Sequence, residues 1–248
     1  MRTLVSKWSV CVSLLLCVLA AHGQSIASTP EDVDAPAVPD TVSEPVPEGL
    51  HGDDWASIRA AYAAGRHAAF AVDGGHRARN AGQQWTTHFD GRGFSTSPDA
   101  GAWTWGLQLE AYGWGAAEPL AAESAAVTAD GQRVSYAWDE RLTEWYVNDG
   151  RGLEHGYTVH ARPESASGAL ALELAVRGEL HPVVSENDRD VRFVDEAGGS
   201  VLTYAGLTVF DADGQQLAAG WKVAGERMRL SIADQASRYP LTIDPIAQ

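Results

Sequence analysis

The chain has 248 residues, of which 45% are hydrophobic and 21% are charged. This composition is that of a globular protein and excludes a chain that is disordered as a whole. Acidic side chains outnumber basic ones by 33 to 18, which gives a net charge of −15. Because such a surface repels phosphate backbones and anionic lipid, the sequence predicts no nucleic-acid partner and no peripheral attachment to membranes.

Residues 1–23 have the pattern of a secretory signal peptide. Basic Arg2 and Lys7 precede an apolar run from Val10 to Ala21, and small residues surround a cleavage site that we place after residue 23. The apolar run is too short to span a bilayer comfortably, so we expect no membrane insertion after cleavage. The leader therefore predicts a secreted protein, located outside the cell or on the cell surface.

Both cysteines, Cys11 and Cys17, lie within this leader. The mature protein is therefore expected to have no thiol, no disulfide and no cysteine metal ligand. Val10 and Leu16 precede the two cysteines where lipoprotein processing requires a small residue, which argues against a lipid anchor. The leader also carries two basic residues, so the mature part has 16 basic against 33 acidic side chains. We expect it to be a soluble monomer.

Residues 24–50 are rich in proline, serine, threonine and acidic residues, as in Pro30-Glu31-Asp32, and show neither helical nor strand periodicity. Segments of this composition cannot bury enough apolar surface to fold. The sequence predicts a disordered acidic linker over residues 24–50 and an ordered module over residues 51–248.

The module is predicted to begin with its only helix. Asp53 or Asp54 can cap the helix, and Gly65 can end it. The apolar residues recur with helical spacing and would form one face. They are Trp55, Ile58, Ala61 and Tyr62.

Beyond Gly65 the pattern changes to short strands separated by turns. Asp-Gly pairs, which favour tight hairpin turns, begin at positions 73, 90, 130, 149 and 213. Leucines at every second position of residues 170–174 lie on one face of a strand. The predicted strands are Gln84–Phe89, Gly93–Thr96, Trp103–Tyr112, Arg133–Trp138, Glu144–Val147, Tyr157–Ala161, Ala169–Val176, Val191–Val194, Val201–Tyr204, Leu207–Phe210, Gly220–Val223, Arg227–Ile232 and Tyr239–Ile243.

More than ten short strands without intervening helices predict an all-β fold, because a parallel sheet would need a helix between successive strands. The predicted architecture is an antiparallel β-sandwich-like module with one short N-terminal helix.

Tryptophans are concentrated between positions 85 and 145 and have two interpretations. Trp103 and Trp105 share one strand face, which Leu107 and Leu109 continue, so this face is predicted to pack in the core. Exposed indole rings can instead stack on sugars. In that alternative, the carbohydrate-binding residues are Trp103, Trp105, Trp114 and Trp145.

Paired carboxylates could hydrolyse a glycosidic bond if two of them flank it at the right separation. The candidate carboxylates are Glu110, Asp139, Glu140, Glu144 and Glu154, and His155 and His160 could carry protons. The sequence fixes none of the distances between them, and acidic residues beside turns are usually solvated. We therefore predict no catalytic residues.

No motif indicates a metal or cofactor. The chain has no nucleophile elbow, no phosphate-binding glycine loop and no His-Glu-x-x-His zinc motif. Residues 211–214, Asp-Ala-Asp-Gly, begin like a calcium loop, but an EF-hand in that register would need glycine at Gln216 and glutamate at Lys222. These residues are predicted to form a hairpin turn, and the protein is predicted to use no cofactor and no metal.

Three stretches resemble a known family. They are residues 84–94 (QWTTHFDGRGF) with 103–107 (WTWGL), residues 144–149 (EWYVND) with 152–156 (GLEHG), and the closing residues 239–246 (YPLTIDPI). Together they resemble the amino-terminal module of secreted bacterial proteins that carry FG-GAP, or integrin-alpha-like, propeller repeats. In such proteins the last stretch leads into the first repeat, whereas here the sequence ends three residues after Pro245.

The resemblance implies a non-enzymatic extracellular module that leads a surface or adhesion protein. It implies no active site, and the calcium sites of the propeller are not carried over. The expected partners are an extracellular protein or polysaccharide, or a propeller domain of the same protein. Two alternatives remain open: a carbohydrate-binding or glycoside-hydrolysing protein that uses the tryptophan-rich half, and a folding or secretion aid for a propeller.

Overall fold

A computed structural model describes residues 45–248, without the side chains of residues 63 and 64. The predicted signal peptide, both cysteines and residues 24–44 of the predicted linker lie outside the described residues. The remaining part of the linker, residues 45–50, is exposed and has no regular secondary structure apart from a turn.

The predicted helix is confirmed as α1 (Gly52–Arg66). Asp53 and Asp54 lie in its first turn and do not cap it, so the predicted capping position is wrong. Both carboxylates still interact favourably with the positive end of the helix dipole, which lies at the N-terminus of α1. Ile58 and Tyr62 are 48% and 69% exposed, so the apolar face of α1 does not enter the core. No helix within residues 45–248 has the length and hydropathy needed to cross a membrane.

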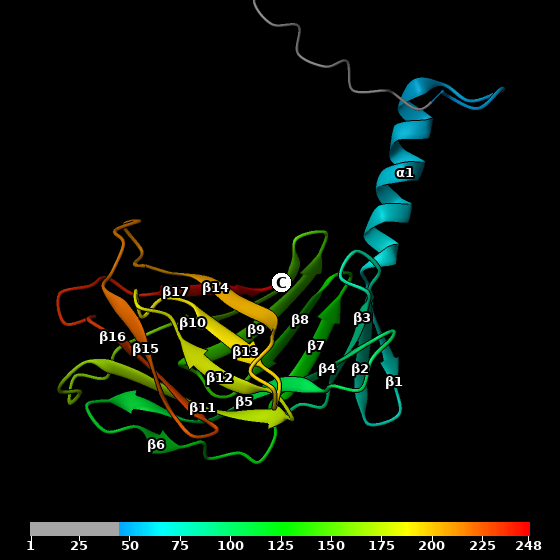
Figure 1. Cartoon of the computed structure of the whole chain (residues 1–248). Coiled ribbons are helices and arrows are strands. Elements are labelled where there is room, and N and C mark those ends of the chain that lie inside the picture. Colours follow the sequence, from blue (N-terminus) through cyan, green and yellow to red (C-terminus); the bar gives the residue numbers. More distant parts are fainter. Residues whose placement is uncertain (1–44) are drawn as a thin grey trace, which may run out of the picture. The chain divides into compact units, whose positions relative to one another are not determined.

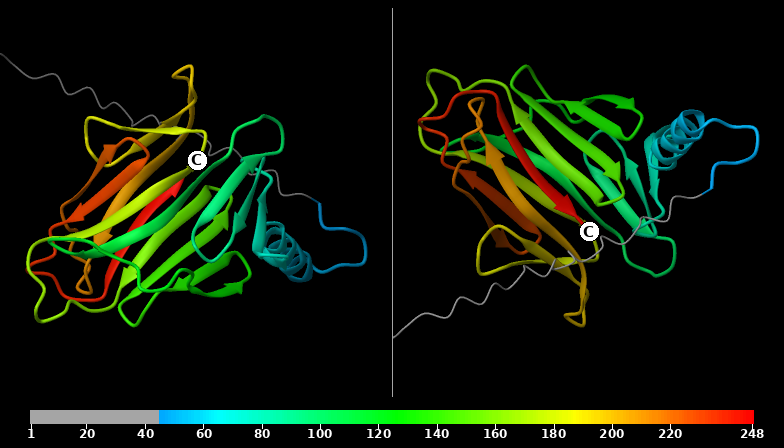
Figure 2. Two further views of the ribbon diagram at one scale, coloured as in Figure 1. Left: turned by 90° about the horizontal axis from the view of Figure 1, so that it is seen from below. Right: turned by 90° about the horizontal axis from the view of Figure 1, so that it is seen from above.

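The predicted β-sandwich is also confirmed, since two antiparallel sheets face each other (Figures 1 and 2). In spatial order the nine-stranded sheet contains β1 (Ala69–Val72), β2 (Gly75–Asn80), β3 (Trp85–Phe89), β4 (Phe94–Pro98), β5 (Trp105–Trp114), β11 (Leu170–Gly178), β16 (Arg227–Ile232) and β15 (Ala219–Ala224), with β6 (Glu118–Pro119) paired to β5. The eight-stranded sheet contains β12 (His181–Val184), β13 (Val191–Val194), β14 (Ser200–Phe210), β17 (Leu241–Ala247), β10 (Gly152–Val159), β9 (Leu142–Asp149), β8 (Arg133–Ala137) and β7 (Ala126–Asp130).

Every predicted strand overlaps an observed one. The predicted strands Val201–Tyr204 and Leu207–Phe210, however, form a single strand, β14. Strand β14 runs through Gly206, where the sequence pattern indicated a break, because a bulge absorbs the irregularity and Gly206 adopts a positive φ of 73°. Strand β17 extends past Ile243 to Ala247, and its Pro245 lies opposite this bulge. A proline has no N–H to give to a neighbouring strand, so a bulge is a position that tolerates it.

All five predicted Asp-Gly turns are confirmed as connections between strands. Asp73-Gly74 forms a two-residue hairpin between Val72 and Gly75, which pair with each other. Gly74 has a φ of 77°, a conformation that a residue with a Cβ rarely adopts. The predicted turn at residues 211–214 is stabilised by Asp211, whose Oδ1 accepts hydrogen bonds from the backbone of Asp213 and Gln215.

Aromatic rings fill the space between the sheets. Trp105 is fully buried, and its ring centroid lies 5.0 Å from those of Phe94 and Phe193. The predicted core face of β5 is therefore confirmed for Trp105 together with Leu107 and Leu109, which are also buried. Trp103, which precedes the strand, is half-buried and packs against the edge of this core.

Hydrogen bonds link the two sheets at both sides of the sandwich. On one side the Trp221 backbone N–H of β15 donates to Asp188 in the loop between β12 and β13. On the other side the Ala69 N–H of β1 donates to Gly131, and Asn80 of β2 bonds to Asn148 of β9.

Replacing Trp105 by alanine removes a large ring from the centre of the core. We expect Trp105→Ala to lower the free energy of unfolding by about 3–5 kcal/mol, measured by urea denaturation, because the surrounding rings cannot fill the cavity. Tyr62→Ala, which removes an exposed ring from α1, is the matched control and should change stability by less than ~1 kcal/mol. Wild-type stability of Trp105→Ala would show that this ring is not a core residue.

Candidate functional site

A groove with a volume of about 390 Å³ lies at one end of the sandwich. Its walls come from the end of β5 and the segment through β6, from the turn between β8 and β9, and from the loop between β10 and β11. The lining residues are Tyr112, Gly113, Trp114, Ala116, Glu118, Pro119, Leu120, Ala121, Asp139, Arg141, Pro163, Ser165, Ala166 and Ser167.

A bulge in β5 points two aromatic residues into this groove. Leu109 lies opposite Leu174 and Ala111 opposite Glu173, so Glu110 has no partner across the pair. Regular alternation from Leu109 would turn residues 112 and 114 outwards. The extra residue instead places Tyr112 opposite Leu172 and Trp114 opposite Leu170, two leucines buried between the sheets.

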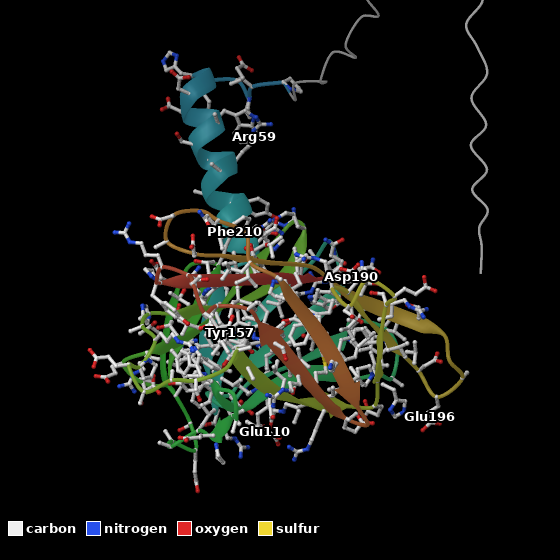
Figure 3. The ribbon with its side chains drawn as sticks, turned by 90° about the vertical axis from the view of Figure 1, so that its left-hand side faces the viewer. Arg59, Glu110, Tyr157, Asp190, Glu196 and Phe210 are labelled. Atoms are coloured by element: carbon white, nitrogen blue, oxygen red, sulfur yellow. The ribbon has the colours of Figure 1, made fainter. Side chains whose placement is uncertain are left out.

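Glu110 itself lies at the outer surface, where it forms an ion pair with Arg227 (Figure 3). Along β5 the outward-facing Glu110 is therefore followed by Tyr112 and Trp114, which line the groove. Bulges of this kind often re-aim side chains beside functional sites.

Tyr112 and Trp114 form the aromatic part of the groove. Their ring centroids are 6.2 Å apart and their planes meet at 67°, so the two rings form a corner. The Tyr112 hydroxyl donates to Asp139 Oδ2 at 2.5 Å, and Asp139 Oδ1 accepts from the backbone N–H groups of Arg141 and Leu142. Burial and the neighbouring Asp139 carboxylate raise the pKa of Tyr112, so the hydroxyl keeps its proton.

Trp114 is fixed by a buried carboxylate. Its Nε1–H donates to Asp234 Oδ2 at 2.7 Å, and Asp234 also accepts hydrogen bonds from Arg162, Tyr239 and the Leu170 backbone. Burial opposes ionisation of Asp234, but these donors outweigh it and lower the pKa of the carboxyl group below its ordinary value. The ring of Trp114 is therefore held in one orientation by an ionised, fully buried group.

Other polar groups around the groove are free to meet a ligand. Glu118, Ser165 and Ser167 are exposed, and their side chains have no hydrogen-bond partner within residues 45–248. Arg141 forms an ion pair with Glu140 at 2.9 Å and also lines the groove. The groove thus combines two ordered rings with a carboxylate, two hydroxyls and a guanidinium.

The four tryptophans considered for sugar binding do not form one surface. Trp105 lies in the core and Trp103 at its edge, whereas Trp114 lines the groove. Trp145 lies on the outer face of the eight-stranded sheet, flat over Gly156 and beneath the Arg133 guanidinium, which is 4.6 Å from the ring centroid. Of the four, Trp114 alone contributes to the groove.

The candidate carboxylates and histidines also lie apart. Glu110 and Glu154 form ion pairs with arginines, Asp139 and Glu140 lie in the turn beside the groove, and His160 contacts Thr143. Only Glu144 and His155 meet, at 2.7 Å, and both are fully buried. No two of these carboxylates face each other across the groove among the described residues.

Glu144 is the centre of a closed hydrogen-bond network between the sheets. Oε1 contacts His155 Nε2 and accepts from the Tyr157 hydroxyl at 3.1 Å, and Oε2 accepts from Trp138 Nε1 at 2.8 Å. His155 Nδ1 lies 2.9 Å from the Tyr204 hydroxyl, so both ring nitrogens are occupied. Figure 3 shows Tyr157 inside the sandwich. Burial and Glu144 raise the pKa of both tyrosines, which keeps these hydroxyls protonated.

This network has the residue types of a catalytic triad but no access for a substrate, since Glu144, His155, Tyr157 and Tyr204 are completely buried. A candidate acid or base must lie within hydrogen-bond reach of the group that it serves. The network therefore lies in the core and orders it.

Sequence reasoning missed four residues that shape the groove: Tyr112, Arg162, Asp234 and Tyr239. Tyr112 was placed on a strand, but the bulge that turns it inwards leaves no clear signature in the sequence. Asp234 follows β16 in a loop, and its partners lie 64 to 120 positions away except for Tyr239, five residues on. Such distant contacts cannot be read from local patterns.

No protein-family model and no curated protein matches the sequence.

Removing the Glu144 carboxylate should destabilise the core. Glu144→Leu leaves the polar atoms of His155, Tyr157 and Trp138 buried without their acceptor, so we expect a loss of about 3–5 kcal/mol in the free energy of unfolding. Glu140→Gln, at a neighbouring exposed carboxylate, should cost less than ~1 kcal/mol. Equal stability of the two variants in urea denaturation would mean that the buried network contributes nothing.

Asp234→Asn should produce a stability loss that depends on pH. The lowered pKa of Asp234 means that ionisation stabilises the folded state above the ordinary value of 3.8, and that this contribution is lost as pH falls through the folded pKa. We expect the variant to be less stable than the wild type by about 1–3 kcal/mol at pH 7, with the difference shrinking below pH ~4.

Urea denaturation of both proteins from pH 3 to pH 7 measures this difference. Asp213→Asn removes an exposed carboxylate that is paired with Arg238 and serves as the control. A constant difference between wild type and Asp234→Asn over the whole pH range would contradict the assignment of an ionised Asp234.

Proposed function

We propose that the chain is a non-enzymatic extracellular module, the leading domain of a surface or adhesion protein of the FG-GAP type, and that it acts by binding. The observation that carries this proposal is the complete enclosure of Glu144 and His155, the one carboxylate and histidine among the sequence candidates that meet. With that pair inaccessible, the groove offers ordered aromatic rings and unpaired polar groups.

Three further features support the proposal. The leader has the pattern of a signal peptide, the composition of residues 24–50 is that of an acidic linker, and two antiparallel sheets form a packed sandwich. A rigid scaffold with a groove at one end is a common design for recognition, because loops held by a scaffold present binding groups in fixed positions. The partner is an extracellular polysaccharide or protein.

Secretion and turnover can be measured on the same preparation. The full chain is produced in a bacterial host, the medium is collected, and the mature N-terminus is identified by mass spectrometry. We expect a protein in the medium that begins near Gln24 and releases no reducing ends from neutral or anionic polysaccharides. Retention of the leader in the cell, or release of reducing ends in proportion to protein concentration, would contradict the proposal.

A further inference from the structure

We propose that the groove between Tyr112, Trp114 and Ser165 binds a neutral sugar ring of a polysaccharide. This inference rests on the proposed function and names the ligand class of its site. It differs from a platform made of four tryptophans, because Trp105 and Trp145 lie elsewhere and the second aromatic ring is Tyr112.

The two rings provide apolar faces in a fixed corner. A pyranose ring presents C–H groups on its faces and hydroxyls around its rim, so it can stack on one aromatic ring while its edge contacts another. Tyr112 and Trp114 meet at 67° with centroids 6.2 Å apart, which offers a face and an edge together. A flat pair of parallel rings would offer only faces.

Both rings are ordered before any ligand arrives. Asp139 holds the hydroxyl of Tyr112, and Asp234 holds the indole N–H of Trp114. Neither ring has to give up rotamer freedom on binding, which reduces the entropic cost of association. The Arg162 guanidinium lies over one face of the Trp114 ring, 5.8 Å from its centroid, so the recognition surface is the part of the two rings that lines the groove.

Hydroxyl groups of a sugar would find partners around the rings. The Glu118 carboxylate can accept, the Ser165 and Ser167 hydroxyls can donate or accept, and Arg141 can donate. A few convergent polar groups around an aromatic floor are typical of small-molecule sites. The groove volume of about 390 Å³ lies within the range of such sites.

The charge around the groove selects against anionic sugars. Glu118, Asp139 and Glu140 lie in or beside it against the single guanidinium of Arg141, and Arg162 is neutralised by buried Asp234. The whole chain carries a net charge of −15. A uronate or sulfated chain would be repelled, whereas a neutral one would not.

Affinity gel electrophoresis tests this inference with soluble xyloglucan, galactomannan and mixed-linkage β-glucan as neutral probes and polygalacturonate as the anionic probe. We expect at least one neutral polysaccharide to retard the wild-type protein. Tyr112→Ala should weaken retardation by at least about tenfold, because it removes one wall of the corner. Tyr112→Phe keeps the ring and should stay within about threefold of the wild type.

Two variants separate loss of binding from loss of folding. Ser165→Trp fills the groove from an exposed loop position and should abolish retardation while the melting curve stays that of the wild type. Tyr62→Ala removes an exposed ring from α1 and should bind normally. If Tyr112→Ala melts early, Ser165→Trp alone decides the result.

Retardation by polygalacturonate alone, no retardation by any neutral probe, or unchanged binding of Ser165→Trp would overturn the inference. In those cases a secreted protein that releases no reducing ends still satisfies the proposed function. If the protein releases reducing ends and its binding depends on Tyr112, the sugar-binding site is supported. The proposed non-enzymatic function is then wrong.

Discussion

The bulge in β5 is the constraint on which the groove depends. Up to Leu109 the strand buries every second residue in the core, and one extra residue, Glu110, then shifts the alternation so that Tyr112 and Trp114 also turn inwards. Beyond this point the strand reaches the end of the sandwich, where Tyr112 and Trp114 pack against the core and also line the groove. One inserted residue thus converts the end of a core strand into an aromatic recognition surface.

Two buried carboxyl groups, those of Glu144 and Asp234, order different parts of the molecule. A polar group in a protein interior is costly unless its hydrogen bonds are satisfied. Glu144 meets this requirement with His155, Tyr157 and Trp138, and fixes the centre of the eight-stranded sheet. Asp234 does the same at the end of the sandwich, where the group that it orders is Trp114. Glu144 thus orders side chains of the core, whereas Asp234 orders a side chain that lines the groove.

Most of the strands, the turns and the helix could be predicted because they depend on local sequence: alternation, Asp-Gly pairs and helical spacing each act over a few residues. Strands β1, β2, β6, β7 and β12 are not among the predicted ones. Trp105 could be assigned to the core because its strand face is apolar through Leu109. The inward direction of the Tyr112 side chain could not be predicted, because strict alternation predicts the opposite direction. The bulge that reverses it depends on how β5 pairs with β11. Glu144 is one of the candidate carboxylates and His155 a candidate proton carrier, but their burial depends on both sheets and cannot be read from the sequence.

The most direct measurement of the central claim, that Trp114 lies at the ligand site, is an NMR titration that follows the tryptophan indole N–H signals. The signals are assigned with single Trp→Phe variants, and an oligosaccharide from the neutral polysaccharide that retards the protein is added stepwise. The account predicts that the Trp114 signal shifts with saturation while those of Trp105 and Trp145 remain in place. A saturable shift of Trp145 with an unchanged Trp114 would place the ligand on the outer face of the eight-stranded sheet and contradict the account.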